Sequence, residues 1–200
     1  LLSAGSGEEN LPLASQDAGS LDDHHAPTAL SESQLRDLLP ASSSLEREHY
    51  GRSSIGECLL GARRLIEKGA RFVTVNTFDH LRGNLSWDVH GRRGFSTLDD
   101  MARRIAPRYD RAYWALITDL EARGLLDGTL VCCLSEFGRN PVINAAGGRD
   151  HWTGCWTVYF AGGGVQGGRA IGRSDKTGSR PMDRPTSAAE ITATVYHCLG

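Results

Sequence analysis

The sequence SIGECLLGARRLIEKGARFVTVNT, residues 54–77, has the pattern of a helix followed at once by a strand. Ser54 and Glu57 have capping-box spacing, and Gly69 stands where a left-handed glycine commonly ends a helix. Between them lies an apolar stripe made by Leu59, Leu60, Ala62 and Ile66. Residues 71–77 are rich in β-branched and aromatic side chains, which favour a strand. The segment therefore predicts one helix-to-strand unit.

The same pattern recurs further along the chain. Ser96 can cap a second helix, which we expect to kink or split at Pro107 because proline lacks the backbone N–H of a helix interior. A short apolar strand over 129–134 should follow it, and a further strand is expected over 156–160. Ser187 can cap a last helix. This alternation predicts an α/β fold, with a mostly parallel sheet flanked by helices.

Residues 1–44 differ in composition from the rest of the chain. They are rich in Ser, Ala, Gly and Asp, with a short possible helix over 32–39. Such a segment buries too little apolar surface to offset its ordering entropy, so we expect a flexible or poorly packed lead-in. Residues 45–200 are expected to form one α/β domain, because 40% hydrophobic content with four Trp can fill a core.

Charge and hydropathy exclude two classes of partner. The net charge is −2 with both signs spread along the chain, so no basic stripe offers itself to nucleic acid. The sequence has no run of about 18 apolar residues that could span a membrane. Because it begins with Leu1, we expect a fragment whose export signal, if any, lies upstream. The five cysteines contain no Cys-x-x-Cys pair, which favours buried or semi-buried thiols over a zinc knuckle or disulfide framework.

Acidic and imidazole side chains gather in three predicted loops. Asp88 and His90 lie two residues apart, so on extended backbone both point to one side and can share an ion. Glu136 directly follows a predicted buried strand, where an ionisable side chain is costly unless paired or liganded. His151 lies in a glycine-rich loop beyond it. Because an α/β sheet brings such loops to one edge, these residues predict a divalent-metal site.

Each part of this site also has a simpler interpretation. Asp88 and His90 can form a local hydrogen-bonded turn that binds no ion. Glu136 can form a salt bridge with Arg139 in the same loop. His151 can be a structural histidine. The metal hypothesis depends on all three loops meeting at one place.

Several motifs, taken together, resemble one family. In chain order they are Gly69-Ala70-Arg71-Phe72-Val73-Thr74-Val75, Trp87-Asp88-Val89-His90, Gly124-Leu125-Leu126-Asp127-Gly128-Thr129-Leu130-Val131, Ser135-Glu136-Phe137-Gly138-Arg139, Gly148-Arg149-Asp150-His151-Trp152 and Ala161-Gly162-Gly163-Gly164. Their identities and order resemble the family called domain of unknown function 1501, over about residues 46 to 200.

This resemblance implies a branch of the alkaline phosphatase and sulfatase superfamily. Its members hydrolyse phosphate or sulfate esters with divalent metals (Zn, Mn, Ca or Mg) on an α/β/α sheet. By similarity, Asp88, His90 and His151 match the ligands of one metal site. Glu136 falls where the second site has an aspartate, although Phe137 replaces the histidine that normally follows.

The resemblance also implies what this chain lacks. The superfamily's first strand, with its metal-binding aspartate, and the nucleophile loop after it have no counterpart in the sequence. We therefore expect a metal-dependent hydrolase acting on small-molecule or glycan esters in the full-length parent, and little turnover by this chain alone. The alternative is a non-catalytic binding or scaffold domain that keeps the fold while its loops engage a glycan or a protein.

Overall fold

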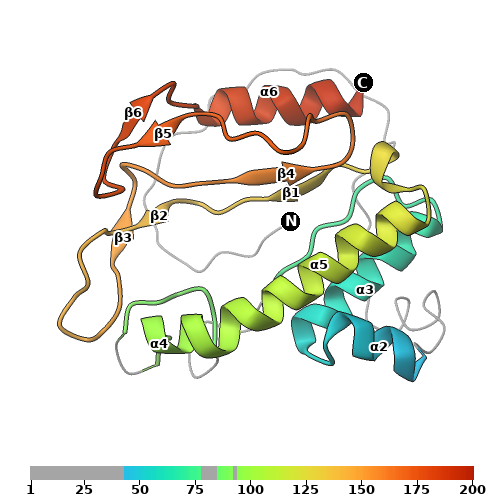
Figure 1. Cartoon of the computed structure of the whole chain (residues 1–200), viewed down its shortest axis with the longest axis horizontal. Coiled ribbons are helices and arrows are strands. Elements are labelled where there is room, and N and C mark those ends of the chain that lie inside the picture. Colours follow the sequence, from blue (N-terminus) through green and yellow to red (C-terminus); the bar gives the residue numbers. More distant parts are fainter. Residues whose placement is uncertain (1–42, 78–84, 92–93) are drawn as a thin grey trace, which may run out of the picture.

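The computed structural model describes residues 43–77, 85–91 and 94–200 (Figure 1). Its helices are α2 (Ser44–Tyr50), α3 (Ser54–Glu67), α4 (Leu98–Asp100), α5 (Ala106–Ala122) and α6 (Ala188–Leu199). A π-helical segment (Met101–Ile105) joins α4 to α5, and a 3₁₀ turn (Leu126–Gly128) follows α5. The strands are β1 (Val131–Cys133), β2 (Gly138–Arg139), β3 (His151–Trp152), β4 (Tyr159–Ala161), β5 (Arg173–Ser174) and β6 (Pro181–Asp183).

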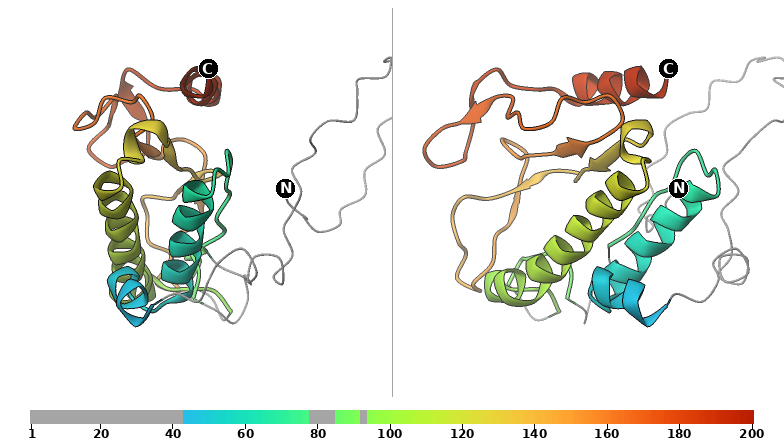
Figure 2. Two further views of the ribbon diagram at one scale, coloured as in Figure 1. Left: turned by 90° about the vertical axis from the view of Figure 1, so that its right-hand side faces the viewer. Right: turned by 45° about the vertical axis from the view of Figure 1, so that its right-hand side comes forward.

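Helices α2, α3 and α5 pack together on one side of the molecule, and the strands and α6 lie on the other (Figures 1 and 2). The buried core lies within the helical side. It is made by Tyr50, Ile55, Leu59, Leu60, Ala112, Ala115, Leu116 and Leu120. Burying each large apolar side chain stabilises the fold by about 1.5–3 kcal/mol, so this cluster is the main source of stability in the described part of the chain.

A buried ion-pair network ties the three helices together. The guanidinium of Arg63, on α3, is 2% exposed. It lies 3.0 Å from Glu46 on α2 and 2.9 Å from Asp119 on α5, and it also pairs with Glu67 one turn further along α3. The hydroxyl of Tyr50 donates to Asp119 at 3.1 Å. The single cation of Arg63 therefore pairs with carboxylates from three separate helices, with Arg64 and Arg123 as the further cations of the network.

The carboxyl group of Glu46 makes stability depend on pH. Partial burial raises its pKa, but hydrogen bonds from the Ser43 N–H, the Arg63 guanidinium and the Ser43 hydroxyl, with the charge of Arg64, lower it from 4.5 to about 2. Because the folded pKa is depressed, this stabilisation is present above pH 4.5 and is lost as the pH falls towards 2.

We expect Glu46→Gln to unfold about 1–2 kcal/mol more easily than wild type at pH 7, after allowance for solvent screening. The difference should become small as the pH falls to 2, where about half of wild-type Glu46 is already protonated. Urea unfolding at a series of pH values measures this, with Glu121→Gln as an exposed glutamate control on α5. A difference that stays constant from pH 7 to pH 2 would contradict the assignment.

The strands pair differently from the predicted sheet. They form three separate two-stranded antiparallel sheets, β1 with β4, β2 with β3 and β5 with β6, so the prediction of a mostly parallel, alkaline-phosphatase-like sheet is wrong. A parallel neighbour needs a crossover connection, usually a helix. Residues 134–158 contain no helix and include the β2–β3 pair, so the chain folds back and β4 enters beside β1 in the opposite direction.

The first predicted strand is also absent. Residues 71–77 join no strand ladder in the described part of the chain, and Phe72 is 74% exposed. Only Val75 packs against the helical core. A strand needs a hydrogen-bonding partner as well as β-forming residues, and none of the described segments supplies one here.

Tyr109, in the first turn of α5, connects the helices to the β1–β4 pair. The hydroxyl of Tyr109 lies 2.9 Å from Sγ of Cys133 on β1 and hydrogen-bonds to the hydroxyl of Tyr159 on β4. Burial and these hydrogen bonds raise the pKa of Tyr109. Val131 packs against the helical core. The strand pair is therefore placed by contacts with one helix.

The helix predictions fare better than the strand predictions. The helix predicted from Ser54 is present as α3, but its N-cap is Ser53, whose side chain accepts from the Gly56 N–H, so the predicted cap is one residue too late. The last helix begins at Ala188 with a complete capping box between Ser187 and Glu190, so that prediction is confirmed. The middle helix changes from a π-helical segment to α5 at Ala106, beside Pro107, and continues without a break in the helical backbone.

Two N-termini differ from expectation. Thr97, rather than Ser96, caps α4 through a capping box with Asp100. Helix α2 is not among the predicted helices, although Ser43 and Glu46 form a capping box of the same kind. The side chain of Ser96 instead holds the loop before α4 closed.

One sequence prediction concerns the lead-in over residues 1–44. Residues 1–42, with the possible helix over 32–39, lie outside the described residues, and α2 begins at Ser44.

No helix in the described ranges is long and apolar enough to cross a membrane. Three of the thiols are half-buried as expected, whereas Cys58 and Cys132 are exposed.

Candidate metal centre

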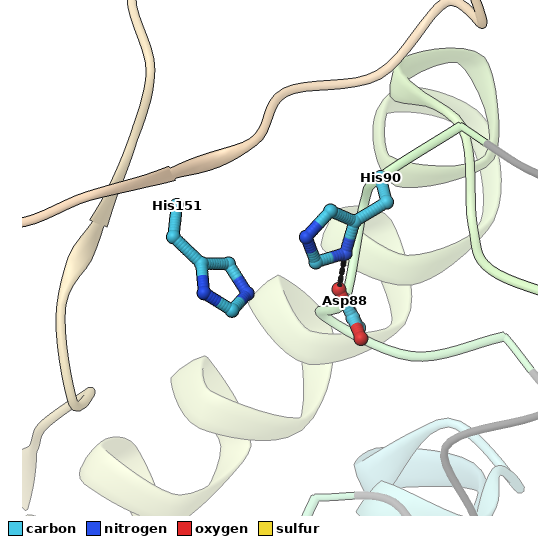
Figure 3. Close-up of side chains that lie close together, drawn as sticks. All are labelled: Asp88, His90 and His151. Atoms are coloured by element: carbon cyan, nitrogen blue, oxygen red, sulfur yellow. Dashed lines mark hydrogen bonds and ion pairs between the residues drawn. The ribbon is translucent and has the colours of Figure 1, made fainter.

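Three side chains from two distant parts of the chain meet in front of α5 (Figure 3). Asp88 and His90 come from the loop before α4, and His151 is the first residue of β3. Each offers one ligand atom, and these atoms all lie within 4.8 Å of one another. The imidazole ring centroids of His90 and His151 are 4.7 Å apart. We call these three residues the metal group, and all three are ligands that the sequence predicts.

The loop that carries Asp88 and His90 is closed by two buried serines. The backbone N–H of Ser86 donates to the Ser96 hydroxyl at 2.9 Å, and the N–H of Ser96 donates to the Asp88 carbonyl at 3.1 Å. The N–H of Asp88 donates to the Ser86 hydroxyl at 3.3 Å. Ser96 therefore holds the loop closed, which explains why the neighbouring Thr97 caps the helix.

Trp87 connects the same loop to the helices. Its indole N–H donates to the Thr77 hydroxyl at 2.7 Å, and its ring meets Tyr109 of α5 edge-on, with centroids 5.2 Å apart. The next residue, Asp88, is thereby fixed at the side of the helical layer.

The glycine-rich loop before β3 contacts the loop of Asp88 and His90, with almost no space between the two backbones. A Cβ atom added to Gly148 would lie 2.2 Å from the carbonyl carbon of His90, and one added to Gly91 would lie 2.3 Å from the Ala146 carbonyl oxygen. Gly91 also has a φ of 73°, which L-residues with side chains rarely adopt. Glycine at both positions therefore lets the two loops touch.

Asn144 connects the two touching loops. Its amide nitrogen donates to the His90 carbonyl at 3.0 Å and to the Asp150 carboxylate at 3.2 Å. Its amide oxygen accepts from the N–H groups of Ala146 and Gly148, both at 3.0 Å. One side chain thus shapes the glycine-rich turn and holds it against the backbone of His90.

The β2–β3 pair places His151 opposite Arg139. The guanidinium of Arg139 donates to Oδ1 of Asp88 at 3.2 Å and to the Arg149 carbonyl at 3.3 Å, and it lies 3.4 Å from Nδ1 of His90. The simpler interpretation of the sequence pairs Arg139 with Glu136. The structure places the charge of Arg139 against the metal group instead.

Glu136 is exposed and is not part of the metal group. The strand before it is not buried as predicted, because Leu134 is 55% exposed, so its burial gives no reason for Glu136 to be liganded. Its role as a fourth ligand stays a prediction.

The donor atoms suit a divalent ion of borderline softness. One carboxylate oxygen and two imidazole nitrogens are ligands of the kind that Zn²⁺ and Mn²⁺ accept. Bonds of about 2.1 Å place two ligand atoms of a tetrahedral ion about 3.4 Å apart. The atoms of the metal group are within 4.8 Å, so binding needs a closure on the order of 1 Å. His151 is exposed and can supply that movement by side-chain rotation.

The contact between Asp88 and His90 competes with a bound ion. Nδ1 of His90 hydrogen-bonds to Oδ1 of Asp88, as the alternative of a local turn predicts. Arg139 bonds to the same oxygen. Nδ1 and Nε2 of one imidazole point away from each other, so a carboxylate bonded to Nδ1 cannot reach an ion on Nε2 of the same ring. An ion shared by Asp88 and His90 must therefore replace this hydrogen bond, and the local turn and the occupied metal site are alternative arrangements of the same side chains.

Comparison with known proteins gives one match. The chain matches no curated protein and no solved structure. A family model described as "Protein of unknown function (DUF1501)" matches residues 14–200, which is most of the chain. This match includes all three residues of the metal group. The chain therefore belongs to the DUF1501 family.

Proposed function

We propose that this chain binds a divalent metal ion through Asp88, His90 and His151, and that the ion serves metal-dependent hydrolysis of phosphate or sulfate esters in the full-length protein. The observation that carries the proposal is the convergence of these three side chains from two loops to within 4.8 Å. The resemblance of the motifs to a superfamily of metal-dependent ester hydrolases supports the reaction class.

The residues of the chain have separate tasks in this proposal. A carboxylate oxygen of Asp88 and one ring nitrogen each of His90 and His151 would hold the ion. An ion held this way would polarise an ester oxygen and lower the pKa of a hydroxyl or water nucleophile. Asn144 keeps the loop before His151 in contact with the backbone of His90.

Metal affinity tests the proposal without any need for turnover. We expect the purified chain to bind Mn²⁺ or Zn²⁺ at one site in a calorimetric titration. Asp88→Ala and His151→Ala should each weaken binding by at least about 100-fold, since loss of a mere supporting partner already costs about 10–100-fold. His197→Ala, at an exposed histidine on α6, is the matched control and should bind as wild type does. Equal affinity in all four proteins would remove the metal site and favour a non-catalytic binding domain.

A further inference from the structure

We propose that Arg139 turns the metal group into a shared site, in which a divalent cation and a tetrahedral oxyanion such as phosphate or sulfate bind cooperatively. This inference rests on the proposed metal site and deepens it by naming Arg139 as the residue that binds the anion beside the ion. The observation behind it is the guanidinium of Arg139, 3.2 Å from Oδ1 of Asp88.

The charges of the site favour this arrangement. Asp88 supplies the only carboxylate of the metal group, and histidines are neutral when they bind a metal. Arg139 stays positively charged at any ordinary pH. A divalent ion would therefore join a guanidinium around a single negative charge. Like charges this close repel strongly in a partly buried site. An anion bound to both cations relieves the repulsion.

The guanidinium of Arg139 is held next to Asp88 by several contacts. Its side chain is only 21% exposed, and Arg139 is paired in register with His151. One amino group is also held by the Arg149 carbonyl at 3.3 Å, and the Phe137 ring lies 5.9 Å from the guanidinium carbon. Arg139 is thus fixed beside the metal group by its strand, its hydrogen bonds and a ring.

Two other charged side chains in the described part of the glycine-rich loop, those of Arg149 and Asp150, are already hydrogen-bonded. The Arg149 guanidinium donates to the carbonyls of Asn140 and Pro141, at 2.9 Å and 2.8 Å. The Asp150 carboxylate accepts from Asn144. Among the residues that the structure describes, the guanidinium of Arg139 is the cationic group placed against the metal group, and its planar fork matches two oxygens of a tetrahedral anion.

The test is a calorimetric titration of the chain with Mn²⁺ in chloride, sulfate or methyl phosphate at matched ionic strength. In wild type we expect sulfate or methyl phosphate to tighten Mn²⁺ binding about tenfold relative to chloride. By linkage, Mn²⁺ should tighten anion binding by the same factor. The two oxyanions, compared at equal concentration, show whether the site prefers a sulfate or a phosphate group.

Arg139→Gln separates cooperative binding from a simple structural ion pair. We expect this variant to bind Mn²⁺ more tightly than wild type in chloride, because the repulsion is gone, and to lose the effect of the oxyanions. Arg139→Lys keeps the charge without the fork and should retain weak Mn²⁺ binding in chloride with reduced coupling. Arg173→Gln, at an exposed arginine on β5, is the control for net charge. Circular dichroism confirms that each variant is folded.

The outcomes distinguish the two proposals. If wild type binds Mn²⁺ with the same affinity in chloride, sulfate and methyl phosphate, the shared site is overturned, but the metal site is not. The shared site is overturned in the same way if Arg139→Gln binds Mn²⁺ more weakly in chloride and keeps the coupling. No binding of Mn²⁺ or Zn²⁺ under any condition would overturn both proposals.

Discussion

Gly148→Ala is expected to weaken metal binding by at least about 100-fold, as much as the loss of a ligand. The added Cβ would lie 2.2 Å from the His90 carbonyl carbon and 2.4 Å from both the Gly91 nitrogen and the Val89 oxygen. All three contacts are with backbone atoms, which cannot rotate away, so the loops must separate. Their separation breaks the hydrogen bond from the Arg149 N–H to the Val89 carbonyl, 2.8 Å long, and moves His151 away from His90.

The fold should survive this substitution in weakened form. Overpacking of a close contact costs about 1–3 kcal/mol, which the helical core can tolerate. Calorimetric titration with Mn²⁺ measures the affinity, and thermal unfolding measures the stability. Gly167→Ala is the matched control, because a Cβ there meets nothing within 4 Å. Unchanged Mn²⁺ affinity in Gly148→Ala would show that the metal group does not depend on contact between the loops.

Arg63→Met is expected to cause the largest loss of stability, about 3–5 kcal/mol in urea unfolding at pH 7. The side chain is 2% exposed and pairs with three carboxylates. Methionine fills much of the volume, so the loss comes from the charge. It removes the buried cation that Glu46, Glu67 and Asp119 share, and leaves only Arg64 and Arg123 to pair with these three carboxylates.

Two comparisons test whether the loss of charge causes the loss of stability: an exposed ion pair as control, and a second substitution at Glu46. Arg103→Met breaks a pair with Asp99 in which the side chains are 77% and 71% exposed, so it should change stability by less than about 0.5 kcal/mol. Arg63→Met should cost less in a Glu46→Gln background, because one of the three carboxylates that Arg63 pairs with is already absent. Equal costs in the two backgrounds would mean that packing, rather than charge, explains the loss.

The metal group was predicted from the sequence only in part. The two-residue spacing of Asp88 and His90 predicts that they share a side on extended backbone, and the structure brings them together. That His151 joins them is, from the sequence, only an expectation based on loops meeting at a parallel sheet edge. The sheet is antiparallel, yet the convergence holds, because the two loops touch directly through Gly91 and Gly148.

Arg139 could not have been placed by sequence reasoning. Its nearest acidic neighbour in the chain is Glu136, whereas its partner in space is Asp88, 51 positions away. The pairing depends on the register of β2 with β3, which sets Arg139 opposite His151. No local pattern encodes such a register, because it depends on how two distant loops pack.

The sequence by itself determined helices α3 and α6 and the residue types of the metal group. Caps, apolar stripes and glycine stops act within one or two turns, so α3 could be located to within one residue and the capping box of Ser187 and Glu190 could be read directly from the chain. The tertiary structure alone decided strand direction, the exposure of Glu136 and the position of Arg139. These features depend on backbone hydrogen bonds and close contacts between segments far apart in the chain, whose energies exist only once those segments meet.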